Sequence, residues 1–148
     1  MNIAFKRLPG GAGLPLPAYQ THGSAGMDLY AAIEAECTIA PGARAFLPCG
    51  FSLAIPQGYE GQVRSRSGLA LKHGIAVLNS PGTIDSDYRG ELAVVLVNHG
   101  DAAFVVSRGM RIAQLVISPV EQAEWTEVDE LPDTGRGYGG YGHTGHGV

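Results

Sequence analysis

The chain reads Asn79-Ser80-Pro81-Gly82-Thr83-Ile84-Asp85-Ser86-Asp87-Tyr88-Arg89-Gly90-Glu91 between two apolar runs, Ile75 to Leu78 and Leu92 to Val97. Short apolar runs separated by a Pro-Gly pair and other turn formers are typical of strands joined in a β-hairpin. Within the stretch, alternation would turn Ile84 toward a core and Asp85 to the opposite face. The sequence therefore predicts a functional site laid across a hairpin.

The composition indicates one turn-rich β domain. The 148 residues are 45% hydrophobic, which suits a single globular domain with a real core. The 22 glycines and nine prolines are too many for a helical protein and lie mostly between short apolar runs. We therefore expect an all-β fold, a jelly-roll-like β-barrel or sandwich of many short strands with at most one short helix.

The C-terminal part differs in composition from the rest. Acidic residues surround a lone Trp125 from Glu121 to Asp133, which favours a solvated edge strand with one aromatic anchor. From Gly135 to Gly147 glycine alternates with aromatic, basic and hydroxyl residues, and such a segment buries too little apolar surface to fold alone. We expect a barrel domain over residues 1–133 and a flexible glycine-rich arm over residues 134–148 that closes an active site.

Charge and cysteine content exclude several classes of function. The formal net charge of -4 argues against a general nucleic-acid coat, although one small anionic ligand is still allowed. Cys37 and Cys49 lack metal-ligand spacing, and we expect buried reduced thiols. Neither a signal pattern nor an apolar run of membrane-spanning length is present, so we expect a cytoplasmic protein that does not enter membranes.

One segment predicts both the helix and an anion site. Ser67-Gly68-Leu69-Ala70-Leu71-Lys72 has a capping hydroxyl followed by good helix formers, and Arg64-Ser65-Arg66 precedes it. Unpaired N–H groups at a helix N-terminus together with arginines form a site for anions. When this segment is considered alone, a solvated rim of basic residues explains it as well as an anion site does.

Further polar residues extend this set. Asp28, considered alone, is the outward position of an ordinary strand, whereas Gln114 lies among buried residues and needs polar partners. Cationic donors imply a polyanionic ligand, and amide and aromatic side chains imply a base and a sugar, so the ligand resembles a nucleotide. Because neither a Ser/His/Asp triad spacing nor a nucleophile elbow occurs, hydrolysis would use water activated by a carboxylate.

Five segments carry a resemblance to a known family. In order they are Ala25-Gly26-Met27-Asp28-Leu29, Arg66-Ser67-Gly68-Leu69-Ala70, Asn79 with Gly82 to Gly90, Arg108 to Leu115, and Arg136 to Gly145. In residue types, order and spacing they resemble the five motifs of the homotrimeric dUTP diphosphatase (dUTPase) family. The resemblance covers nearly the whole chain.

The resemblance implies hydrolysis of dUTP to dUMP and pyrophosphate with Mg²⁺, which keeps uracil out of DNA and supplies dUMP for thymidylate synthesis. Asp85 matches the catalytic carboxylate that orients and deprotonates a water for attack on the α-phosphorus. Tyr88 matches the ring that packs on deoxyribose and leaves no room for a 2′-hydroxyl. The residues that match the uracil-reading surface are Asn79, Gly82, Thr83, Ile84 and Ala93.

The same resemblance assigns phosphate, metal and arm residues. Matches to the phosphate contacts are Arg66, Ser67 and Gly68, with Gln114 beside them, while Asp28 matches an acidic residue that approaches Mg²⁺ only through water. The metal would be held mainly by the substrate phosphates. In a homotrimer the arm of one chain would close a site formed by the other two, with Arg136 at the γ-phosphate and Tyr141 over the uracil.

Two positions depart from the family pattern. Tyr141 stands where phenylalanine is common, which preserves stacking, and His143 stands where serine is common. An imidazole or Thr144 could replace the missing hydroxyl donor.

Two other functions are alternatives to dUTP hydrolysis. A deoxycytidine triphosphate deaminase shares the fold but uses a glutamate in another setting and lacks Asp85-Ser86-Asp87-Tyr88; ammonia release from dCTP would identify it. A catalytically silent nucleotide-binding or regulatory module is the second alternative, against which stands the retention of every acidic and basic motif residue. Pyrophosphate release from dUTP excludes that module.

Overall fold

The computed structural model describes residues 1–143, 145 and 147. This part of the chain contains eleven strands, one short 3₁₀ turn and one α-helix of seven residues, so the all-β prediction with one short helix is confirmed. In chain order the elements are β1 (Ala4–Arg7), η1 (Pro9–Gly11), β2 (Met27–Tyr30), β3 (Cys37–Ile39), β4 (Arg44–Pro48), β5 (Phe51–Ala54), β6 (Tyr59–Arg64), α1 (Ser67–His73), β7 (Ile75–Val77), β8 (Gly82–Ile84), β9 (Ala93–Asn98), β10 (Phe104–Val106) and β11 (Arg111–Pro119).

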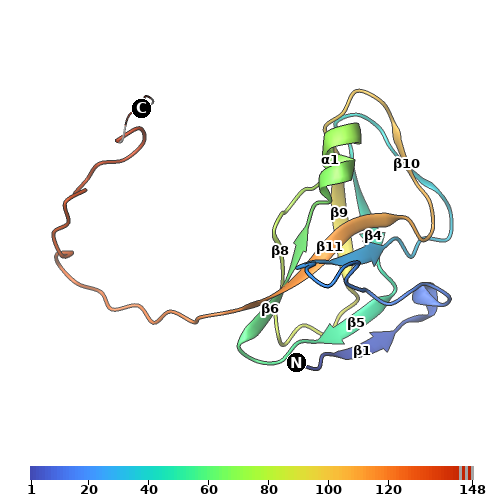
Figure 1. Cartoon of the computed structure of the whole chain (residues 1–148), viewed down its shortest axis with the longest axis horizontal. Helices are drawn as coiled ribbons and strands as arrows, with labels where there is room; N and C mark the ends of the chain where they lie inside the picture. Colours follow the sequence, from blue (N-terminus) through green and yellow to red (C-terminus); the bar gives the residue numbers. More distant parts are fainter. Residues whose placement is uncertain (144, 146, 148) are drawn as a thin grey trace.

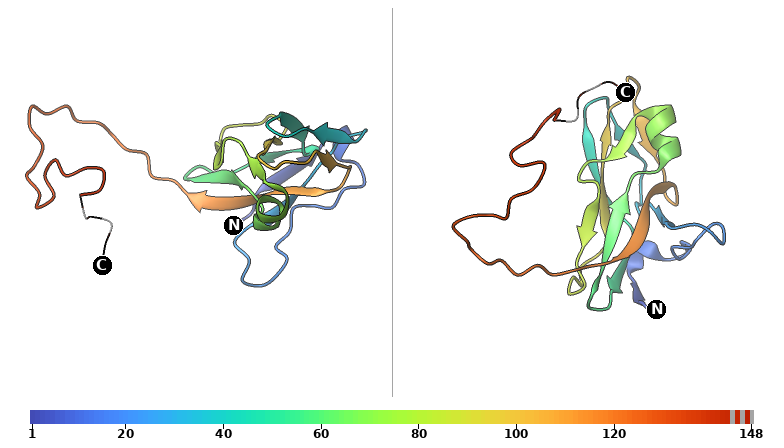
Figure 2. Two further views of the ribbon diagram at one scale, coloured as in Figure 1. Left: turned by 90° about the horizontal axis from the view of Figure 1, so that it is seen from above. Right: turned by 60° about the vertical axis from the view of Figure 1, so that its left-hand side comes forward.

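The strands form antiparallel sheets around one interior. The largest sheet has the order β2-β11-β6-β8, a second has the order β4-β9-β7, and the pairs β1-β5 and β10-β3 complete the body. Figure 1 shows α1 at one end of this body and β1 with β5 at the other, and Figure 2 shows the strands folded around a shared interior. The sheets bury a common set of aliphatic side chains, which includes Leu29, Ile39, Leu47, Ile75, Leu92, Leu96, Ile112 and Leu115.

The cysteines belong to this interior to different degrees. Cys49 is buried and Cys37 is half-buried, and both are free thiols. Burial, and to a lesser degree the charge of Glu91, raises the pKa of Cys49 from an ordinary value of 9.0 to about 12. Cys49 therefore stays protonated and unreactive in the folded protein at neutral pH.

The two apolar runs pair with each other, but they do not form the predicted hairpin, because the polar stretch between them crosses to another sheet. β7 pairs with β9, with Val77 opposite Leu96. The connecting chain leaves this sheet, and as β8 it pairs with β6, with Ile84 opposite Gly61. Asp85 therefore follows an edge strand of the largest sheet instead of lying in a hairpin turn.

The helix begins differently from the prediction. Arg66 occupies the N-cap position without a side-chain capping bond, and Ser67 is the first helical residue, so the predicted capping role of its hydroxyl is wrong. The helix ends at His73, and Gly74 is its C-cap, with a φ of 67° and a backbone N–H that donates to the carbonyl oxygen of Ala70. Glycine suits this left-handed position because it has no Cβ.

The segment after β11 does not form the strand that its composition indicated. The backbone N–H of Val120 donates to the carbonyl oxygen of Gly58, and in the described part of the tail no strand follows β11. Trp125 is 95% exposed, so the predicted edge strand over Glu121 to Asp133 is wrong. Glu121 and Gln122 still line the larger hollow, and the tail then runs away from the barrel (Figure 1). The boundary between residues 133 and 134 stays a prediction.

Within the described residues no helix is long and apolar enough to cross a membrane.

Asn98 should be a main determinant of stability, because it is fully buried and its side chain joins three backbone groups. Its amide nitrogen donates to the carbonyl oxygens of Ile39 and Ala102 at 2.8 Å each, and its amide oxygen accepts from the N–H of Gly100 at 2.9 Å. Asn98→Ala should lower stability by about 3 kcal/mol, which is roughly 10 °C in Tm. Thermal unfolding at fixed protein concentration measures this. The control Asn2→Ala should leave Tm unchanged, and equal Tm values for both variants would contradict the prediction.

Candidate active site

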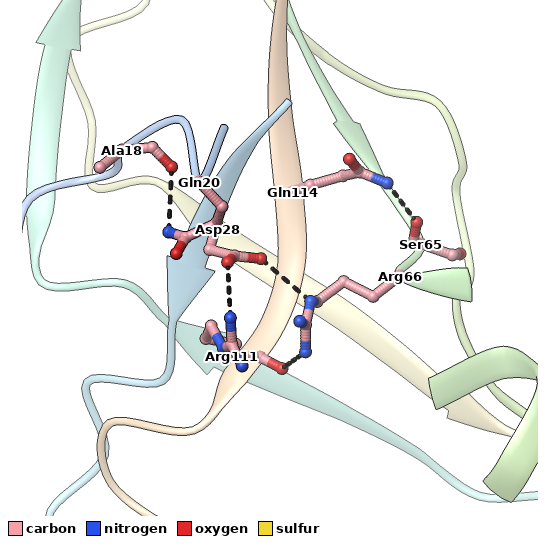
Figure 3. A network of polar contacts seen from close by, with 7 residues as sticks. All are labelled: Ala18, Gln20, Asp28, Ser65, Arg66, Arg111 and Gln114. Carbon is pink, nitrogen blue, oxygen red and sulfur yellow. Dashed lines mark hydrogen bonds and ion pairs between the residues drawn. The ribbon is translucent and has the colours of Figure 1, made fainter. Parts of the chain in front are cut away.

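A polar hollow of about 400 Å³ lies over β2, β11 and the end of β6. The charged residues of its lining are three arginines and one carboxylate. Figure 3 shows this carboxylate, on Asp28, between Arg66 and Arg111. The residues that matter for its chemistry are Gly26, Asp28, Arg64, Arg66, Arg111 and Gln114. We call this the basic hollow.

Asp28 is the centre of the basic hollow. One carboxylate oxygen pairs with Nε of Arg66 at 3.0 Å and the other with Nη1 of Arg111 at 3.2 Å. Asp28 lies opposite Gln114, on the outer side of the sheet, so its predicted outward strand position is confirmed. Only 8% of the residue is exposed, because the two arginines cover the carboxylate. Arg66 also donates from Nη1 to the carbonyl oxygen of Arg111 at 3.0 Å. These contacts fix the plane of the Arg66 guanidinium and leave its remaining N–H groups for a ligand.

A β-bulge brings Arg111 into the basic hollow. Along the pairing of β11 with β2, Arg111 is opposite Tyr30 but Ala113 is opposite Leu29, so β11 contains one extra residue. Ile112 and Ala113 are consequently both buried, and Arg111 lies on the same outer side as Gln114. Sequence reasoning assigned no role to Arg111, since strict alternation would turn it inward with Ala113. The adjacent apolar pair before Gln114 was the available signal.

Gln114 supports the turn that carries the predicted phosphate contacts. Its Nε2 donates to the carbonyl oxygen of Ser65 at 2.9 Å, and the Ser65 hydroxyl accepts from the N–H of Val77 at 2.8 Å. The prediction that this glutamine needs polar partners is confirmed. A Cβ on Gly26 would lie 2.3 Å from Oε1 of Gln114, so only glycine leaves room for the amide. Ser67 and Gly68 follow this turn and are exposed beside the hollow.

The basic hollow is suited to a polyanion and not to a bare metal ion. In the described part of the chain no three His, Cys, Asp or Glu side chains are grouped as metal ligands. Both oxygens of Asp28 already face guanidinium groups. A Mg²⁺ ion here would need most of its ligands from water and from the phosphates of a bound molecule, which is a common arrangement for this ion.

Two of the other predicted site residues belong to a second, larger hollow of about 1040 Å³. Thr83 and Asp85 line this hollow and are exposed. Asn79 is exposed beside Gly82, and a Cβ built on that glycine would lie 3.2 Å from Nδ2 of Asn79. Ile84 in β8 and Ala93 at the start of β9 are half-buried, and the Tyr88 ring is 44% exposed.

A single chain does not bring the two hollows together. They share no lining residue. Since Ile84 pairs with Gly61, Asp85 follows β8 level with Glu60, six residues before Arg66. At roughly 3.3 Å per residue this is a separation of about 20 Å along β6.

The predicted arm residues line neither hollow. Arg136 and Tyr141 are exposed in the extended tail (Figure 1). His143 is described and exposed, whereas Thr144 lies outside the described residues.

Comparison with known proteins decides the family. The family model described as dUTPase matches residues 13–145. The chain belongs to the dUTPase family. It is 62% identical over 141 residues to the deoxyuridine 5′-triphosphate nucleotidohydrolase of Rhizobium etli, covering 94% of this chain and 90% of that protein. The protein of the same name from Anaplasma marginale is 55% identical over 145 residues, covering 98% and 99%.

Solved dUTPase structures share the fold. The dUTPase of Staphylococcus bacteriophage 80alpha, solved with dUpNHpp, superposes with a TM-score of 0.87 at 25% identity and covers 98% of this chain and 99% of that one. The predicted jelly-roll-like architecture is confirmed by this similarity and by the strand order described above.

The basic hollow should bind a linear polyphosphate through Arg66. Arg66→Ala removes charge-assisted hydrogen bonds of about 1.5–3 kcal/mol, so the affinity for inorganic triphosphate should fall at least about tenfold. Isothermal titration calorimetry measures the affinity. Arg44→Ala removes an exposed arginine of β4 and is the matched control. Equal affinity of wild type and Arg66→Ala would contradict the assignment.

Proposed function

We propose that this chain hydrolyses dUTP to dUMP and pyrophosphate. The observation that carries the proposal is the basic hollow, in which Asp28 orients Arg66 beside an exposed Ser67-Gly68 turn suited to a triphosphate. Family membership and 62% identity to a named deoxyuridine 5′-triphosphate nucleotidohydrolase support the choice of nucleotide.

The chemistry needs a base and a sink for negative charge. Asp85 is an exposed carboxylate able to hold a water and accept its proton as the oxygen attacks the α-phosphorus. The bond from the α-phosphorus to the bridging oxygen breaks, and pyrophosphate leaves with the bond electrons. The guanidinium groups of the basic hollow stabilise the charge that develops on the phosphate oxygens.

Base and sugar would be selected by the stretch around β8. Asn79 and the backbone near Thr83, Ile84 and Ala93 would read the uracil edge, where cytosine would leave buried polar groups mismatched. The Tyr88 ring would pack on deoxyribose and exclude a 2′-hydroxyl. The exposure of Asn79 and Tyr88 supports this proposal.

Mg²⁺ would be bound with the substrate and held mainly by its phosphates. When bound, the ion neutralises phosphate charge and fixes the conformation of the triphosphate. Asp28 would contact it only through water, because each carboxylate oxygen can accept a further hydrogen bond beside its arginine.

We propose a homotrimer whose active sites are shared between subunits. The separation of about 20 Å along β6 between Asp85 and Arg66 supports sharing, because one triphosphate molecule must reach both residues. The arm of a third chain would bring Arg136 to the γ-phosphate and Tyr141 over the uracil, with His143 as a further donor. The cytoplasmic location and the absence of nucleic-acid partners remain predictions.

Asp85→Asn should abolish most turnover while keeping substrate binding. The amide preserves the shape of the side chain but cannot accept the proton, so kcat should fall about 10²- to 10⁴-fold. Pyrophosphate release measures kcat, and calorimetry with a non-hydrolysable dUTP analogue measures binding. Asp101→Asn, an exposed carboxylate in the turn after β9, is the control. A near-normal rate for Asp85→Asn would remove this residue from the role of base.

Mixed trimers test whether sites are shared. Asp85→Asn and Arg66→Ala chains are each expected to be inactive, but a site that takes Asp85 from one chain and Arg66 from another can be intact. After unfolding and joint refolding at equal amounts, activity should recover to about a quarter of the wild-type value, the random fraction of intact combinations. Separately refolded chains mixed afterwards are the control. No recovery in joint trimers would mean that each chain supplies both residues to its own site.

A further inference from the structure

The Tyr88 side chain folds back over Gly90. Its hydroxyl donates to the carbonyl oxygen of Glu91 at 3.0 Å. A Cβ on Gly90 would lie 2.3, 2.5 and 2.8 Å from Oη, Cζ and Cε2 of the tyrosine. The φ angle of Gly90 is not positive, so what this position requires is space and not a special backbone conformation. Only glycine lets the ring lie where it does.

The loop around the ring is held in place from both sides. Arg89 donates from Nη1 to the carbonyl oxygens of Ser86 and Tyr88 at 2.7 and 2.8 Å, which closes the turn. The Glu91 carboxylate accepts from the N–H of Gly50 at 2.8 Å, which fastens the end of the loop to the β4–β5 connection. The backbone of Gly90 therefore cannot easily withdraw to make room for a side chain.

We propose that Gly90 is a specificity-determining residue that acts by positioning the Tyr88 ring. This inference rests on the proposed function, in which the exposed face of that ring excludes the 2′-hydroxyl of a ribonucleotide. The ring lies directly on the Gly90 backbone, and its hydroxyl is fixed to Glu91. The height of the ring above the loop is thus set by the absence of a side chain at residue 90.

An added methyl group would move the ring. Non-bonded carbon atoms are in favourable contact at about 3.5–4.0 Å, so the ring must shift by about 1 Å or swing away from Glu91. Either movement changes the surface against which the sugar packs. Such a change acts on the surface that contacts the sugar, so it should alter the discrimination between dUTP and UTP more than the rate of the chemical step. Damage to Asp85 in the same loop would instead lower the rates for both nucleotides together.

Gly90→Ala should lower the ratio of kcat/KM for dUTP to kcat/KM for UTP at least about tenfold. Both constants are measured by pyrophosphate release at equal Mg²⁺. Gly10→Ala is the matched control, since its new Cβ would meet nothing closer than the Ala32 carbonyl oxygen at 3.7 Å. The control should keep the wild-type ratio. An unchanged ratio in Gly90→Ala, or an equal loss for both nucleotides, would overturn the inference.

The double variant tests whether Gly90 acts through the ring. Adding Gly90→Ala to Tyr88→Ala should change neither the nucleotide ratio nor Tm, because the ring that collides with the new methyl group is gone. A further fall in both would overturn the positioning role. The Tm comparison stays decisive even where Gly90→Ala alone is too unstable to assay. A wild type that does not hydrolyse dUTP would instead refute the proposed function.

Discussion

The buried carboxylate of Asp28 is the constraint on which the basic hollow depends. A charge that is 8% exposed is costly unless it is paired and hydrogen-bonded, and here each oxygen faces one guanidinium. Arg66 precedes α1 and Arg111 begins β11, so the pairing ties three segments of the chain to one another. The strand order β2-β11-β6 is what makes that pairing geometrically available.

Position in the sheet also separates the residues to which we assign the two chemical tasks. The guanidinium groups gather at one end of β6, and Asp85 follows the edge strand near the other end. In the proposed trimer, a site shared between subunits would bring these two ends together, because one triphosphate must reach both Asp85 and Arg66.

Two glycines, which have no side chain, leave the space that two neighbouring side chains of the site occupy. Gly26 leaves room for the Gln114 amide, which in turn holds the Ser65 turn before Arg66. Gly90 leaves room for the Tyr88 ring. In both places a functional side chain lies directly on a backbone, where its position varies less than it would against another flexible side chain.

The sequence by itself determined the all-β class, the single short helix, the adjacency of β7 and β9 and the need of Gln114 for partners, because periodicity and turn chemistry are local properties. The motif residues came from the resemblance to the dUTPase family. Only the tertiary structure decided that β8 joins β6, that Asp28 is buried, and that residues 121–133 form no strand. The β11 bulge that places Arg111 outward is equally non-local. Alternation tells which side chains avoid water, but strand pairing and a one-residue bulge depend on which strand lies alongside.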